Sequence, residues 1–170
     1  MKCVSSVSVV GLSYGGFVAY SMGVKYREFV EKIVICGSGV CLEEKDIKDG
    51  LFPVSDLDEA ANILVPQTPQ KLRELVGDYV QEKRELIKAI AKDRNISELP
   101  KISKPTLIIW GEHDLVFPLE LGHRLKRHLG DNAQIVVIKN AGHAFCAEKA
   151  KEFYNVLMSF LVDSKPPGQI

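Results

Sequence analysis

The feature that most constrains the fold of this chain is a set of four short apolar runs. Their sequences are SVSVV, KIVIC, PTLIIW and QIVVI, at residues 6–10, 32–36, 105–110 and 134–138. They are continuously apolar rather than alternating, which is typical of strands whose two faces are both covered by other parts of the protein. The sequence therefore predicts a parallel sheet of about four strands.

Segments with helical periodicity separate these runs. Residues 16–26 follow the first run, and residues 119–129 and 147–162 each carry apolar side chains at helical spacing. Strands that alternate with helices in this way indicate an α/β domain, with helices flanking a doubly wound parallel sheet.

The long stretch between the second and third runs has no strand signal. Within it, residues 70–92 carry one apolar stripe at helical spacing. We expect residues 41–98 to form a helical insertion, residues 1–40 and 99–163 to form the α/β core, and residues 164–170 to be a loose tail.

Composition excludes several classes of function. Lys+Arg and Asp+Glu number 22 each, so no basic field for nucleic acid or an anionic membrane is indicated. No apolar run approaches the roughly 18 to 20 residues that span a bilayer, and the serine-broken start is not typical of a signal peptide. The four cysteines lack metal-site spacing and predict buried free thiols in a reducing, cytoplasmic compartment; they are Cys3, Cys36, Cys41 and Cys146.

The first run leads into a turn that has a serine between glycines, Gly11-Leu12-Ser13-Tyr14-Gly15. This pattern between a strand and a helix is typical of a nucleophile elbow, where small flanking residues leave room for a sharp, strained turn. The backbone N–H of Tyr14 would then point toward a developing oxyanion. Two other interpretations stay open: a dinucleotide-binding turn, which lacks its middle glycine here, and a plain turn serine.

Two polar residues follow later runs in corresponding places. Asp114 comes just after the third run, in WGEHD, and His143 comes just after the fourth, in KNAGH. Such an acid can orient an imidazole, and such a histidine can act as the general base for Ser13. Taken alone, each is more often an ordinary turn residue. Together they follow the serine in the order Ser, Asp, His, each past a separate strand.

The stretches VVGLSYGGFVAY, PTLIIWGEHDLVFP and IKNAGHAF resemble the α/β-hydrolase superfamily, most of all its meta-cleavage-product and monoacylglycerol hydrolase-like serine hydrolases, including plant members. The resemblance covers residues 6–162. It implies Ser13 as nucleophile, Asp114 as acid and His143 as base, with no cofactor and no metal. It also implies that residues 41–98 are a lid. A serine at the elbow argues against epoxide hydrolase or dehalogenase chemistry.

The resemblance also implies a departure from the family ahead of the elbow. The family sheet has eight strands with the elbow after the fifth, so the first four strands and the loop that supplies a second oxyanion-hole N–H would be absent here. Losing one such donor typically costs about 10²–10³ in kcat. The strand at residues 6–10 would become an edge, which invites pairing with another chain.

Two classes of function therefore compete. One is a serine hydrolase that cleaves a small apolar ester or ketone through an acyl-enzyme. The other is a truncated, catalytically impaired isoform that acts as a binding or interaction module, including self-association through the exposed edge strand. Apolar side chains in the expected lid, such as Leu51, Phe52, Leu57 and Leu64, suit an apolar substrate but are more often explained by packing.

Overall fold

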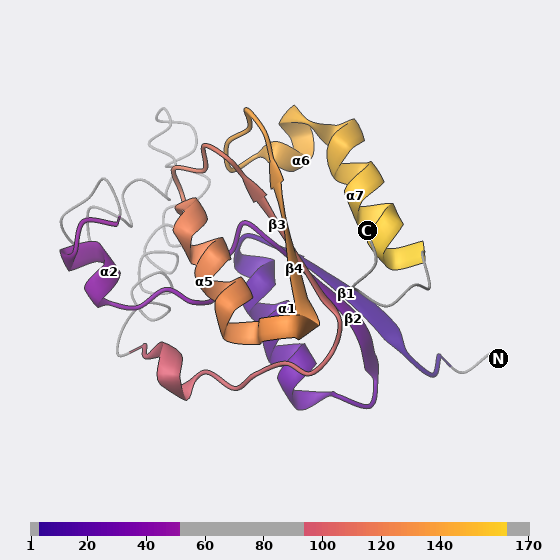
Figure 1. Ribbon diagram of the computed structural model, residues 1–170. Helices are drawn as coiled ribbons and strands as arrows, with labels where there is room; N and C mark the ends of the chain where they lie inside the picture. Colours follow the sequence, from indigo (N-terminus) through magenta and orange to yellow (C-terminus); the bar gives the residue numbers. More distant parts are fainter. Residues whose placement is uncertain (1–3, 52–93, 163–170) are drawn as a thin grey trace, which may run out of the picture. The chain divides into compact units, whose positions relative to one another are not determined.

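A computed structural model describes residues 4–51 and 94–162 of the chain, and its core is a parallel β-sheet (Figure 1). The sheet has four strands in the order β1-β2-β3-β4, and every neighbouring pair is parallel. The strands are β1 (Val7–Leu12), β2 (Val30–Cys36), β3 (Thr106–Gly111) and β4 (Ala133–Ile138). The predicted fold class, with four parallel strands flanked by helices, is confirmed.

Helices cover both faces of this sheet (Figure 1). Helix α1 packs on β1 and β2, α5 packs on β3 and β4, and α7 packs against the opposite face. The helices of this part of the chain are α1 (Tyr14–Lys25), α5 (Leu119–Leu129), α6 (Phe145–Glu148) and α7 (Ala150–Val162), with a short 3-10 turn, η2 (Gly130–Asn132). Because both faces are covered, the central strands can be apolar throughout, as their sequences predict.

The two faces of the sheet bury different sets of side chains. On the α1 and α5 side, Ile33 and Ile35 lie close to glycines of α1, and Trp110 lies against Gly122 of α5. On the other side, residues of β2, β3 and β4 form a buried cluster with two residues that follow β4, and side chains of α7 pack against it; the cluster is Val34, Cys36, Leu107, Ile109, Ile138, Ala141 and Phe145. The core therefore lies on both sides of β2 and β3.

Helix α7 is held at its C-terminal end by a lysine from the sheet. Lys32 on β2 donates to the carbonyl oxygens of Phe160 and Leu161, both at 3.0 Å, and its ammonium lies 5.7 Å from the Phe160 ring centre. The last carbonyls of a helix have no intrahelical partner and carry the negative end of its dipole, so a cation there is favourable. This contact fixes α7 over β2 and the strands beyond it.

The chain divides into two compact units, residues 1–41 with 100–170 and residues 42–99. In the second unit the described elements are α2 (Lys45–Lys48) and a 3-10 turn, η1 (Ile96–Glu98). There Glu43 accepts a hydrogen bond from the backbone N–H of Ile96 at 3.0 Å. The predicted helical stripe at residues 70–92 and the tail at residues 164–170 lie outside the described residues, so the lid stays a prediction.

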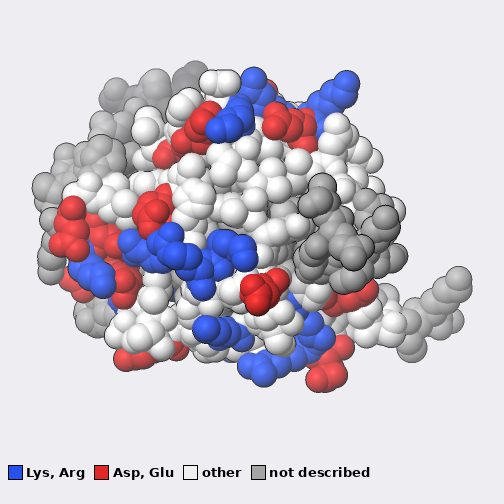
Figure 2. Space-filling model, in the orientation of Figure 1, with Lys and Arg blue, Asp and Glu red and all other residues white. Residues whose placement is uncertain are grey.

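The surface carries charges of both signs, which are interspersed on the face shown in Figure 2. In the part of the chain that the structure describes, no helix is long and apolar enough to cross a bilayer. The described cysteines, Cys36, Cys41 and Cys146, are free thiols, and the first two are buried.

Candidate active site

Ser13 occupies a sharp turn between β1 and α1. Its φ of 49° and ψ of −118° put a non-glycine residue in a left-handed conformation, which costs on the order of 1–3 kcal/mol and is common at functional sites. Its backbone N–H donates to the carbonyl oxygen of Cys36 at 2.8 Å, so the turn is tied to the end of β2. Ser13 stands at the N-cap of α1, yet its side chain makes no capping bond. The hydroxyl is therefore left for another partner.

Glycines around this turn allow its close packing, but of the two positions that the sequence pattern predicts, one is crowded and the other is not. A Cβ at Gly11 would lie 2.2 Å from the carbonyl oxygen of Gly15, whereas a Cβ at Gly15 would meet nothing within 4 Å. The second crowded position is Gly16, where a Cβ would lie 2.4 Å from that of Ser38. The expectation of crowding on both sides of Ser13 is thus right for Gly11 and wrong for Gly15, because α1 is pressed onto the β2 loop through Gly16.

The structure brings the three predicted residues together at the carboxyl ends of three strands. The Nε2 atom of His143 lies 3.1 Å from Oγ of Ser13, and its Nδ1 atom lies 2.8 Å from Oδ2 of Asp114. A single imidazole therefore contacts the serine hydroxyl with one nitrogen and the carboxylate with the other. The proposed general base is within hydrogen-bond reach of the proton that it would accept.

Asp114 is held rigidly in the turn after β3. Its side chain is fully buried, and its Oδ1 atom accepts the backbone N–H groups of Val116 and Phe117, both at 2.9 Å. The other oxygen, Oδ2, contacts His143. A buried carboxylate with this many donors cannot rotate without losing bonds that burial makes costly, so it is suited to fixing the orientation of the imidazole.

Two further carboxylates hold the loop that carries His143. Glu112 accepts the backbone N–H of Asn140 at 2.9 Å, and Glu148 accepts that of Gly142 at 3.0 Å. The bond from Asn140, followed by the one from Lys139, lowers the pKa of Glu112 from its usual value. The sequence analysis missed both residues, because one lies in a turn and the other on α6, and nothing local marks them.

Comparison with known proteins decides the family. Residues 4–156 match the model of the alpha/beta hydrolase family. The chain belongs to the α/β-hydrolase family. This match covers most of the chain. It agrees with the parallel sheet and with the strained serine between the first strand and the first helix.

Relatives of this α/β-hydrolase chain are longer than it is. It is 28% identical over 176 residues to a 2-hydroxy-6-oxononadienedioate/2-hydroxy-6-oxononatrienedioate hydrolase of Pseudomonas sp, covering 90% of this chain and 62% of the relative. It is 26% identical to monoacylglycerol lipase ABHD6 of Mus musculus, covering 90% of this chain and 54% of the lipase. The chain thus spans less than two thirds of the length of either relative.

Solved structures show the same fold. MGS-M2, an alpha/beta hydrolase enzyme from a Medee basin deep-sea metagenome library, matches with a TM-score of 0.66 and 26% identity, covering 98% of this chain and 69% of that one. A meta-cleavage product hydrolase from Pseudomonas fluorescens IP01 matches with a TM-score of 0.64 at 22% identity, covering 95% and 66%. At 22% identity, the match to the meta-cleavage product hydrolase shows a shared fold and nothing more.

Two residues beside the imidazole of this hydrolase-family chain also escaped the sequence analysis. Gly37 has a φ of +49°, and a Cβ there would lie 3.3 Å from Oδ2 of Asp114 and 3.4 Å from Nδ1 of His143. The ring of Phe117 meets the imidazole edge-on, with centres 5.9 Å apart. The positive φ favours glycine at this position, and a side chain there would crowd the imidazole and the carboxylate. The aromatic ring limits how the imidazole can tilt.

Other polar groups near the site have structural explanations. Burial, with a smaller contribution from Cys146, raises the pKa of the Cys36 thiol to about 12, so this cysteine stays protonated and is no rival nucleophile. Among residues 4–51 and 94–162, no group of three or more His, Cys, Asp or Glu side chains is placed to hold a metal ion.

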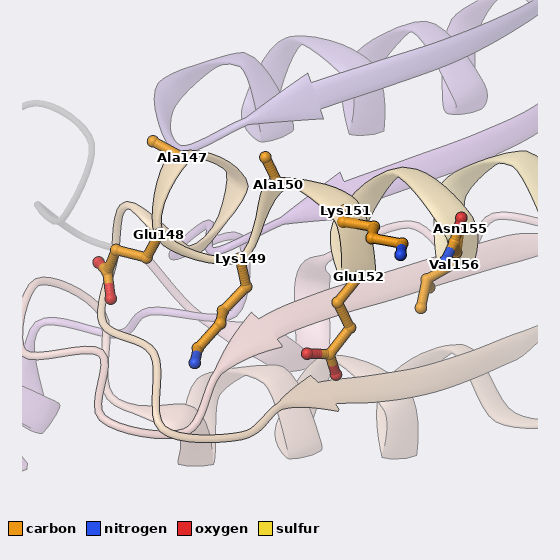
Figure 3. A pocket seen from close by; sticks show the side chains of 8 residues that line it. All are labelled: Ala147, Glu148, Lys149, Ala150, Lys151, Glu152, Asn155 and Val156. Carbon is orange, nitrogen blue, oxygen red and sulfur yellow. The ribbon is translucent and has the colours of Figure 1, made fainter.

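Two surface hollows of the described residues are lined by residues other than Ser13, Asp114 and His143. One, of about 590 Å³, lies along α6 and α7 and is shown in Figure 3; its lining residues are Ala147, Glu148, Lys149, Ala150, Lys151, Glu152, Asn155 and Val156. Another, of about 360 Å³, lies on α1. The candidate active site is therefore defined by the hydrogen bonds that join its three residues.

Proposed function

We propose that this chain is a serine hydrolase in which Ser13, His143 and Asp114 form a catalytic triad. The single observation that carries the proposal is the position of the His143 imidazole, which is 3.1 Å from Oγ of Ser13 and 2.8 Å from Oδ2 of Asp114. Two features support it: the hydroxyl is free of any capping bond, and the carboxylate is buried and held by two backbone donors.

In the proposed reaction, Oγ of Ser13 attacks a carbonyl carbon while Nε2 of His143 accepts the hydroxyl proton. Asp114 keeps Nδ1 protonated and stabilises the imidazolium that forms. The leaving group departs with the proton from Nε2, as an alcohol from an ester or as a protonated carbon from a diketone. Water then attacks the acyl-enzyme with His143 again as base, which releases the acid and restores the serine.

The proposed oxyanion donor is the backbone N–H of Tyr14. Tyr14 directly follows the nucleophile and is the first residue of α1. The first N–H groups of a helix have no intrahelical acceptor, and they lie at the positive end of its dipole. A negative oxygen formed at the carbon bonded to Ser13 would be stabilised there.

For the substrate we propose a small apolar ester or ketone. The names of the relatives supply the two classes to compare, a 2-hydroxy-6-oxo dienedioate for the Pseudomonas hydrolase and a monoacylglycerol for the mouse lipase. Hydrolysis of short- and medium-chain nitrophenyl esters, measured beside cleavage of a dienedioate, separates ester from carbon–carbon bond chemistry.

Active-site labelling tests the triad directly. A fluorophosphonate probe should label the native chain but not Ser13→Ala, while Ser21→Ala, which removes an exposed serine of the same helix, should keep the label. Circular dichroism establishes that each sample is folded. A folded native chain that takes no label would contradict the proposal.

A second candidate function is that of a non-catalytic interaction module. It is favoured by one observation: Val10 and Leu12 on β1 are 37% and 41% exposed, although β1 belongs to the main sheet. A folded chain that neither reacts with the probe nor hydrolyses any ester, but still associates, would support this second function.

A further inference from the structure

The residue proposed as general base lies in a loop that is anchored at both of its ends. His143 belongs to the connection between β4 and α6, residues 139–144. Ile138, before this connection, and Phe145, after it, are both buried, at 0% and 2% exposed. Among the hydrogen bonds of the described residues, none involves the backbone of His143 itself. The backbone that carries the imidazole is therefore placed by the bonds of its neighbours.

The first half of this loop runs along the turn that carries Asp114. The backbone N–H of Glu112 donates to the carbonyl oxygen of Ile138 at 3.0 Å. The next N–H, that of His113, donates to the carbonyl oxygen of Ala141 at 2.9 Å. These bonds continue the pairing of β3 with β4 beyond the ends of the two strands. They fix the loop relative to the proposed acid as far as Ala141.

One side chain holds the second half of the loop. The backbone N–H of Gly142, directly before His143, donates to Oε2 of Glu148 at 3.0 Å. This bond closes a ring that runs from residue 142 to residue 148 and contains His143. Because the acceptor is a carboxylate, the hydrogen bond is charge-assisted and is stronger than one between neutral groups. The loop is therefore held up to the residue next to the imidazole.

Glu148 itself lies on an anchored helix. It is the last residue of α6, and its backbone N–H donates to the carbonyl oxygen of Ala144 at 3.0 Å. Phe145, at the start of this helix, is buried, and its ring meets that of Phe153 on α7 edge-on, with centres 5.8 Å apart. Helix α6 is thus fixed to the core, and the carboxylate of Glu148 connects the loop to that fixed helix.

We propose that Glu148 is a positioning residue for His143. Its carboxylate holds the Gly142 N–H, and this keeps Nε2 of the imidazole within reach of Oγ of Ser13 while Nδ1 stays on Asp114. Glu148 acts through the loop, because it bonds to the backbone of Gly142 and not to the imidazole or the serine hydroxyl. The inference rests on the proposed triad and adds a residue that aligns it.

The expected effect is on the rate of reaction and not on the binding of a reagent. A displacement of about 1 Å at a reacting group can cost on the order of 10²-fold in rate. When the Glu148 bond is lost, Asp114 and the ring of Phe117 still restrict the imidazole. We therefore expect a loss of about tenfold, well below the roughly 10⁴-fold loss expected when the carboxylate of Asp114 is replaced.

Labelling kinetics with a fluorophosphonate probe test this role, because they separate the maximal labelling rate, kinact, from the half-saturating probe concentration, KI. Glu148→Ala should lower kinact about tenfold and leave KI unchanged. Glu148→Gln keeps an oxygen that can accept the Gly142 N–H, so it should retain most of the native kinact. Glu152→Ala is the matched control and should label like the native chain, because Glu152 is an exposed carboxylate beside the same hollow but lies on α7 (Figure 3).

Two further measurements follow the loop without any reaction. Amide hydrogen exchange of Gly142 should be faster in Glu148→Ala than in the native chain, and unchanged in Glu152→Ala. The urea midpoint of unfolding should move little in any of these variants, because both side chains are exposed. A purely structural role for Glu148 would give a lower midpoint with the native kinact.

Three outcomes would overturn this inference. The first is a Glu148→Ala chain that keeps the native kinact although its Gly142 amide exchanges faster; the triad would then stand without Glu148. The second is an equal loss of kinact in Glu152→Ala, which would indicate a general effect of surface charge. The third is a Glu148→Gln chain as slow as Glu148→Ala, which would show that the hydrogen bond is not what matters. A folded native chain that takes no label would contradict the proposed triad itself, before any substitution is compared.

Discussion

Strands β1 and β3 carry two parts of the same candidate site, yet they are packed very differently. All six residues of β3 are buried, and it pairs with β2 on one side and β4 on the other. Strand β1 pairs with β2, and its residues alternate between exposed and half-buried up to Gly11. Among the described strands, the proposed acid thus follows an inner, fully buried strand, and the proposed nucleophile follows the more exposed strand β1. The candidate site joins a buried part to a more exposed part.

The largest expected effect is on the reaction rate, when the buried carboxylate of Asp114 is replaced. Asp114→Asn should lower the rate of ester hydrolysis or probe labelling by about 10⁴-fold, because an amide no longer holds the imidazole in the required tautomer or stabilises its cation. The measurement is the labelling rate at fixed probe concentration, with the native chain alongside. An Asp114→Asn chain that reacts at the native rate would show that the carboxylate has no part in the reaction.

The next largest effect is on the free energy of unfolding, which should depend on how well β1 and β3 are packed. Ile108→Ala on β3 removes a fully buried side chain and should lower the free energy of unfolding by about 2–5 kcal/mol. Val10→Ala on β1 should cost less than about 1 kcal/mol in dilute solution. Urea titration of both variants measures the difference. Equal costs for the two variants at low concentration would mean that β1 is as well packed as β3.

The smallest effect concerns the turn between β4 and His143. The pKa of Glu112 is lowered, first by the Asn140 backbone N–H and then by Lys139, so the folded state favours the carboxylate. Its contribution to stability should be present above the ordinary glutamate pKa of about 4.3, and it should be lost as the pH falls through the lowered value. Glu112→Gln should therefore be less stable than the native chain at neutral pH, and the gap should close in acid.

A control separates this local effect from general surface charge. Glu120→Gln removes a carboxylate that pairs with Arg127 on the exposed side of α5. Among the described residues, Glu120 is bonded to Arg127 and not to the loop that carries His143. A gap for Glu112→Gln that persists unchanged in acid would contradict the role of its charge. The amide hydrogen-exchange rate of Asn140 gives a second readout, since only the Glu112 variant should raise it.

Much of this architecture could be predicted from the chain alone. The four strands are found within about two residues of the predicted runs, and the helices predicted at residues 16–26 and 119–129 match as well. The single helix predicted over residues 147–162 is instead two helices, α6 and α7, which meet at Lys149. These features are local: a doubly covered strand must be apolar throughout, and a helix must repeat its apolar side chains every three to four residues. Ser13, Asp114 and His143 could be chosen because each follows a strand, and parallel strands end at one edge of their sheet.

The sequence by itself determined the elements, their alternation and the chain order of the three candidate residues, because these depend on neighbours a few positions apart. Only the tertiary structure decided that Gly16 and not Gly15 is crowded, that Gly37 and Phe117 confine the imidazole, and that Glu112 and Glu148 hold its loop. Each of these depends on contacts that fold-level packing creates between separate turns and helices. Such contacts leave no periodic trace in the chain, so they become visible only when the sheet brings its loops together.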